Sequence, residues 1–242
     1  MLSALTFVAS LVILGNPRSV YIRRAATVGA VLGAYDVCVA LWVASRTGYP
    51  WASSFSYSMI GLMIAVVATA GFVLAGEAGL PGLWSSSRKA RNSVQIAGGA
   101  LIGLILGTIH WVPLLKAVPD LPAVMEARAG GPIGAACLSL RSLLADDVMY
   151  RVLVLVGLLG IAKAVLPDSG RWAAMAPVAA ALLVTSLVMR WDPAHRTLLA
   201  GVSAAVYGLV YLRWGPLSLL ASRLAIVALA WPLARYLVHL GW

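Results

Sequence analysis

Charged side chains are scarce in this sequence of 242 residues. They make up 11% of the chain, against about 25% in an average soluble domain. Hydrophobic residues account for 62%, and the mean hydropathy is +0.93. Because so few charges cannot cover a water-soluble surface, the composition excludes a soluble enzyme and a disordered chain. It indicates an integral membrane protein that has the lipid bilayer as a partner.

Cysteine is also rare, and the charges are strongly unbalanced in sign. Cys38 and Cys137 both lie in apolar runs, without the spacing of a disulfide scaffold or of a cysteine zinc site. Lysine and arginine total 18 against 8 acidic residues, which gives a net charge of +10. In a membrane protein this excess is typical of basic loops that face anionic lipid and set the topology. We therefore expect no nucleic-acid partner.

Apolar segments recur along the whole chain and predict an all-α fold. A helix that crosses the roughly 30 Å hydrocarbon core needs about 20 apolar residues. The segments are 1–15, 25–45, 57–76, 94–115, 131–166, 172–189, 197–214 and 217–241. The first is short for a span, and 131–166 is long and carries charges. Together they predict a polytopic bundle of seven to eight transmembrane helices.

The loops between these segments predict the topology and a division of the chain. Basic clusters at 18–24 and 88–91 are separated by two predicted helices, so both face the same side of the membrane. The positive-inside rule makes that side cytoplasmic. The mixed-charge loop at 117–132 then faces outward. We divide the chain into N-terminal transmembrane helices, 1–93, and a helical core, 94–242.

Three glycines in the 94–115 segment are spaced four residues apart: Gly99, Gly103 and Gly107. Small residues at this spacing allow two membrane helices to bring their backbones close together. The pattern predicts tight packing against another helix and carries no chemistry of its own.

A few ionisable residues lie inside or at the ends of apolar segments, where each is costly unless it is paired or solvated. They are Asp36, His110, Arg141, Asp146, Asp147, Arg151, His195 and Arg223. We read Asp36 and His110 as partners in helix–helix hydrogen bonds. The others include the densest cluster, at 144–152.

In this cluster Asp147 and Arg151 are four residues apart, so they can pair along one helix face. Asp146 is rotated by about 100° from Asp147 and is expected to point into a poorly solvated cavity, where a carboxylate can act as a general base. The alternative is a polar contact that only holds two helices together.

The stretch Asp146-Asp147-Val-Met-Tyr150-Arg151 resembles the Glu-Glu-x-x-x-Arg motif of the CPBP family, which contains type II CAAX prenyl endopeptidases and Abi-type membrane proteases. Downstream, Trp191-Asp-Pro-Ala-His195 resembles the family's second motif, an aromatic residue followed four positions later by histidine. The turn after residue 211 is also similar to the family's next helix and turn. The resemblance covers roughly 94–230.

Two departures from the family pattern bear on activity. Aspartate replaces glutamate in the first motif, which shortens each side chain by about 1.5 Å. The third motif, His-x-x-x-Asn or Asp, falls on Arg223 and Val227, which do not match it. Arg223 either donates hydrogen bonds to an oxyanion or binds a carboxylate and silences the site. Charge balance predicts a direct contact of Arg223 with Asp146 or Asp147.

The resemblance implies an intramembrane endopeptidase that acts on a membrane-associated peptide or protein. Asp146 and His195 would hold and deprotonate the attacking water, while Asp147 and Arg151 orient the site. Arg223 stands where an electrophilic stabiliser belongs. The residues predicted to contact substrate are Tyr150 and Trp191. No cofactor is expected, because a zinc ion at Asp146 and His195 would have only two of the three protein ligands that a catalytic zinc requires.

Other functions remain open at this point. The mismatched third motif favours a non-catalytic subunit or scaffold of a larger membrane complex. Gly201-Val-Ser203 resembles the nucleophile segment of rhomboid proteases, with His239 as the base, and a transporter is the third alternative. The high content of alanine, leucine, glycine and arginine suits a bacterial cytoplasmic membrane.

Overall fold

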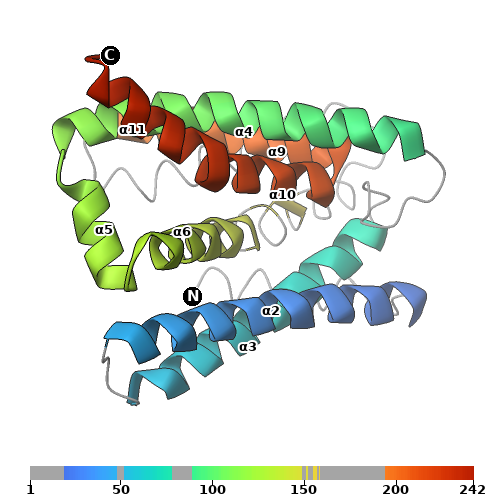
Figure 1. Cartoon of the computed structure of the whole chain (residues 1–242). Helices are drawn as coiled ribbons and strands as arrows, with labels where there is room; N and C mark the ends of the chain where they lie inside the picture. The colour runs from blue at the N-terminus through green and yellow to red at the C-terminus, as the bar shows by residue number, and fades with distance from the viewer. Residues whose placement is uncertain are drawn as a thin grey trace. The chain divides into compact units, whose positions relative to one another are not determined.

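The computed structural model describes residues 19–47, 52–77, 89–148, 151, 155–156, 158 and 194–242. Within these residues every regular element is helical, which confirms the predicted all-α class (Figure 1). Three helical stretches are long and apolar enough to cross a membrane: Ala25–Thr47, Ser93–Ala117 and Pro216–His239. They support a membrane protein. The predicted segments 1–15 and 172–189 lie outside the described residues, so the count of seven to eight spans stays a prediction.

The described helices lie in the following order along the chain. Their bounds are α2 Ser19–Thr47, α3 Ala52–Glu77, α4 Lys89–Ala117, α5 Leu121–Ala129, α6 Pro132–Asp146, α9 Ala194–Trp214, α10 Pro216–Ala225, the π-helix η2 Ile226–Ala230, and α11 Trp231–His239. Proline begins α6 and α10, where its missing N–H costs no helical hydrogen bond. Gly130 ends α5 with a φ of 71°, and Gly215 separates α9 from α10 with a φ of 88°, a backbone conformation that glycine adopts without strain.

Two predicted segments differ from the observed elements. The stretch 117–132 was expected to be a loop, but most of it forms α5, with a proline in its first turn. The long segment 131–166 begins as α6 and changes at Asp147 into a π-helical turn. A π-turn inserts an extra residue into the helical repeat and so changes which side chains share a face. Periodicity in the sequence does not reveal such a turn.

Contacts between Cα atoms group the chain into two units, each built from separated segments. Unit 1 contains 1–30, 65–87 and 146–216, and unit 2 contains 31–64, 88–145 and 217–242. The grouping follows spatial contacts and not chain order. The division at 93/94, drawn from the sequence, stays a prediction.

In unit 2, α4 packs along α10, η2 and α11. A Cβ atom added to Gly99, Gly103 or Gly107 of α4 would collide with one of these partners. The distances would be 2.2 Å from Gly99 to the Ser218 carbonyl oxygen, 2.1 Å from Gly103 to that of Ser222, and 2.7 Å from Gly107 to the Ala230 Cβ. This confirms the predicted close packing at the glycines. The partner residue numbers rise together with the glycine numbers, so the two helical stretches run in parallel (Figure 1).

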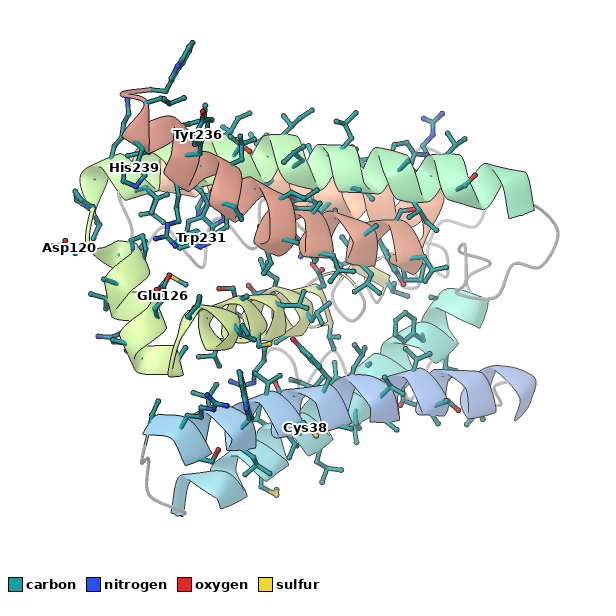
Figure 2. The ribbon with its side chains drawn as sticks, viewed as in Figure 1. Cys38, Asp120, Glu126, Trp231, Tyr236 and His239 are labelled. Carbon is teal, nitrogen blue, oxygen red and sulfur yellow. The ribbon has the colours of Figure 1, made fainter. Side chains whose placement is uncertain are left out.

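One end of unit 2 is closed by α5, which connects α4 to α6 (Figure 1). Arg235 of α11 donates a hydrogen bond to Glu126 of α5 at 3.0 Å, in a partly exposed ion pair. Nearby, the Trp111 and Trp231 rings meet edge to face with centroids 4.5 Å apart. Figure 2 shows Glu126 and Trp231 at this same end. The ion pair and the aromatic contact therefore tie α11 to the α4–α5 corner.

Candidate functional site

The first motif forms a buried ion pair at the point where α6 becomes π-helical. Asp147 and Arg151 are 4% and 8% exposed, and the Arg151 Nη1 donates a hydrogen bond to the Asp147 Oδ1. This confirms the pairing predicted from their spacing. Burial of both groups makes the pair interdependent, because removal of one partner leaves an uncompensated charge in a poorly solvated environment. π-turns occur frequently at functional sites.

The ion pair also contacts α9. The Arg151 guanidinium carbon lies 5.4 Å from the centroid of the Tyr207 ring, within the range of a cation–π interaction. Tyr207 is buried, and one turn later the Tyr211 side chain is only 1% exposed. Among the described residues, the Tyr211 hydroxyl has no hydrogen-bond partner. The helix that carries the first motif therefore packs against α9, the helix that begins next to the second motif.

Asp146 differs from the expectation. It is the last residue of α6, and its side chain is exposed, whereas the adjacent Asp147 is buried. Neighbouring helical residues are rotated by about 100° from each other, so only one of the two carboxylates can face the buried interior. In the structure Asp147 occupies the buried face. The expectation that the Asp146 carboxylate is desolvated is therefore wrong.

The second motif is described only in part. His195 is the second residue of α9, and its side chain lies outside the described part, as do Trp191 and Tyr150. Tyr207 follows His195 by twelve residues, which is about 18 Å of helical rise. Arg151 therefore contacts α9 well away from its His195 end. The roles predicted for His195, Trp191 and Tyr150 stay predictions.

The third-motif position is occupied by a buried arginine. Arg223 is 3% exposed in α10 and lies three residues before Ile226, the first residue of the π-helix η2. Val227, at the position of the family's Asn or Asp, is half-buried within η2. Arg223 belongs to unit 2, and Asp146 and Asp147 belong to unit 1, so the predicted contact of Arg223 with these carboxylates stays a prediction.

A second, partly buried ion pair joins α2 to α6, and the sequence did not predict it. Arg141 of α6 donates through Nε to the Asp36 Oδ1 at 2.6 Å and through Nη2 to Oδ2 at 3.1 Å. Asp36 lies on α2 and is 3% exposed. The reading of Asp36 as a helix–helix partner is confirmed. In the sequence, the only indication of this pair is that both charged residues lie in apolar segments. Because 105 residues separate them, only the fold brings them together.

The remaining sequence candidates are placed as follows. His110 is exposed on α4 and meets the Trp111 ring edge to face at 5.4 Å. Ser203 lies in unit 1 and His239 in unit 2, so the rhomboid-like reading stays a hypothesis. Among the described residues, no group of three or more histidine, cysteine, aspartate or glutamate side chains could hold a metal ion.

Comparison with known proteins adds no relative. No protein-family model matches the chain, and neither a curated protein nor a solved structure matches it. The similarity to the CPBP family therefore rests on the two motifs, on their order and spacing, and on the chemistry of the residues that form them.

Proposed function

We propose that the chain is an intramembrane endopeptidase-like protein of the CPBP type that hydrolyses peptide bonds of membrane-associated substrates. The observation that carries the proposal is the buried Asp147–Arg151 pair with its contact to Tyr207. This arrangement joins the helix of the first motif to the helix of the second. It also leaves Asp146 exposed at the end of α6.

The roles follow from charge and accessibility. Asp146 and His195 together hold a water molecule. They remove a proton from this water as the water oxygen attacks the peptide carbonyl carbon. The carbon–nitrogen bond then breaks, and the proton passes to the leaving amine. Asp147 is engaged by Arg151 and orients the turn that carries Asp146. Arg223 stands at the third-motif position, where the family pattern carries the donors that stabilise an oxyanion.

The protein belongs, in this proposal, in a bacterial cytoplasmic membrane. Its basic clusters at 18–24 and 88–91 face the cytoplasm, and its substrate is a peptide or protein segment at or within the bilayer. Tyr150 and Trp191 are the proposed substrate contacts.

The test is proteolysis by the full-length protein in proteoliposomes that contain a library of membrane peptides, with mass spectrometry of the products. We expect cleavage by the parent and its loss in Asp146→Asn. The matched control is Asp120→Asn, which removes an exposed carboxylate outside the motifs and should leave cleavage unchanged. Equal cleavage by the parent and by Asp146→Asn would refute the role of Asp146, and an inert parent would refute the proposed activity.

A second candidate is a non-catalytic subunit of a larger membrane complex. It is favoured by a specific observation: the two buried carboxylates, Asp36 and Asp147, each accept hydrogen bonds from an arginine. The Asp36–Arg141 pair joins α2 to α6, and the Asp147–Arg151 pair lies along one helical turn. Both contacts can have a purely structural role. Under this function, a parent that cleaves nothing would co-purify from native membranes with a constant set of membrane proteins. If the parent protein cleaves no peptide and also purifies without partner proteins, the proposed role as a subunit is wrong as well.

A further inference from the structure

Two adjacent residues of α2 hold α6 at positions one helical turn apart. Asp36 accepts the two hydrogen bonds of Arg141, and the Tyr35 hydroxyl donates to the Cys137 carbonyl oxygen at 3.3 Å. All four residues belong to unit 2. A planar guanidinium that binds both oxygens of a carboxylate constrains direction as well as distance. With the second contact one turn away, α2 sets both the rotation and the axial position of α6.

The helix held in this way leads directly to the first motif. Arg141 precedes Asp146 by five residues along α6, which is about 7.5 Å of rise and about 140° of rotation. The Asp36–Arg141 pair therefore acts on a different face of α6 from the one that presents Asp146. Asp36 acts on the last turns of α6 through Arg141.

We propose that Asp36 is a positioning residue for the proposed peptidase site, acting through Arg141 on the end of α6. The inference rests on the proposed function. A buried ion pair is expensive to desolvate, and apolar residues of similar volume often match or exceed its stability. What the pair supplies is a unique rotation and register for α6. Displacement of a catalytic group by about 1 Å can reduce a rate by about 10²-fold.

The test separates position from stability with a double substitution, Asp36→Leu with Arg141→Met, in the full-length protein. Because both charges of this pair are removed together, the melting temperature in detergent should equal or exceed that of the parent. We expect kcat on a cleaved library peptide to fall by about 10²-fold, with KM unchanged. Asp36→Glu, which keeps the ion pair, should retain more of the parent kcat than Asp36→Asn.

The matched control is Glu126→Gln with Arg235→Gln. It removes another interhelical ion pair of unit 2, one that joins α5 to α11 and does not involve α6. This variant should keep the parent kcat. If the Asp36→Leu, Arg141→Met protein melts like the parent and also keeps the parent kcat, the positioning role is wrong. A lower melting temperature, with an unchanged kcat per folded molecule, would reduce the pair to a structural contact and would also overturn the proposal.

Hydrogen exchange distinguishes failure of this inference from failure of the proposed function. In the same double variant, amides of residues 138–146 should exchange faster than in the parent, while those of α4 should not change. If the parent cleaves no peptide, the proposed activity fails, but faster exchange at 138–146 still supports control of α6 by Asp36. Unchanged exchange in this segment would overturn the inference whether or not the parent is active.

Discussion

Gly103 of α4 lies directly against the Ser222 backbone of α10, where a Cβ atom on the glycine would be 2.1 Å from the carbonyl oxygen. Backbone cannot yield to such an overlap as a flexible side chain can, so the two helices meet at a distance that only glycine permits. Ser222 is followed immediately by the buried Arg223. The glycine contact therefore sets the place of the third-motif residue within unit 2.

Gly103→Val should destabilise the protein, because a larger side chain forces α4 and α10 apart. Overpacking of this kind costs about 1–3 kcal/mol, measurable as a lower melting temperature in detergent. Leu101→Val introduces the same residue at an exposed position of α4 and should have little effect. Equal melting of the two variants would contradict the close contact.

The parallel packing of α4 with α10 and α11 predicts the location of the C-terminus. If both stretches cross the membrane, the chain between them crosses an odd number of times. Their N-terminal ends then share a side with the basic cluster at 88–91, which is cytoplasmic by the positive-inside rule. A reporter fused after Trp242 should therefore lie outside the cytoplasm. An alkaline phosphatase fusion should be active, and a green fluorescent protein fusion should not fluoresce. A fluorescent fusion at this position would contradict the topology.

Arg151→Ala should strongly destabilise the fold, because it leaves the Asp147 carboxylate buried without its arginine. Breaking a buried pair in this way costs about 3–5 kcal/mol. Asp147→Leu with Arg151→Met removes both charges and should recover much of this loss. Arg128→Ala, at an exposed site on α5, is the control. Melting unaffected by Arg151→Ala would show that the pair contributes little to the fold.

Replacement of Tyr211 and of Tyr35 by phenylalanine should change the melting temperature in opposite directions. The Tyr211 hydroxyl is buried without a partner among the described residues, and burial of an unsatisfied polar group costs about 1–3 kcal/mol. Tyr211→Phe should therefore raise the melting temperature. Tyr35→Phe removes the hydrogen bond to Cys137 and should lower it. A decrease for Tyr211→Phe would mean that its hydroxyl bonds to a group beyond the described residues.

Restoration of the third motif tests whether Arg223 silences the site. Arg223→His with Val227→Asn brings back the side chains that the family pattern carries, and we expect it to start or raise cleavage of the membrane-peptide library. The gain should approach the roughly 10²–10³-fold that an oxyanion donor contributes. A parent that cleaves, together with an inert double variant, would instead assign Arg223 to the mechanism.

Local features of the sequence were sufficient for several parts of the structure. The scarcity of charge indicated a membrane protein, and the apolar segments predicted an all-α class. The spacing of Asp147 and Arg151 predicted their ion pair, and the glycine spacing in α4 predicted close packing. Each of these depends on composition or on residues within one or two helical turns, where the geometry of a helix is known in advance.

The tertiary structure decided two kinds of feature that the sequence does not reveal. One is a contact between residues distant in sequence, and the other is a change in the helical repeat. The partner of Asp36 is Arg141, 105 residues away, and the guanidinium of Arg151 lies over Tyr207. The π-helical turn at Asp147 ends the α-helical phase on which a face assignment depends, and Asp146 proved exposed where a desolvated carboxylate was expected. A sequence states which charges must be neutralised in a membrane, but the choice of partner depends on how the helices pack.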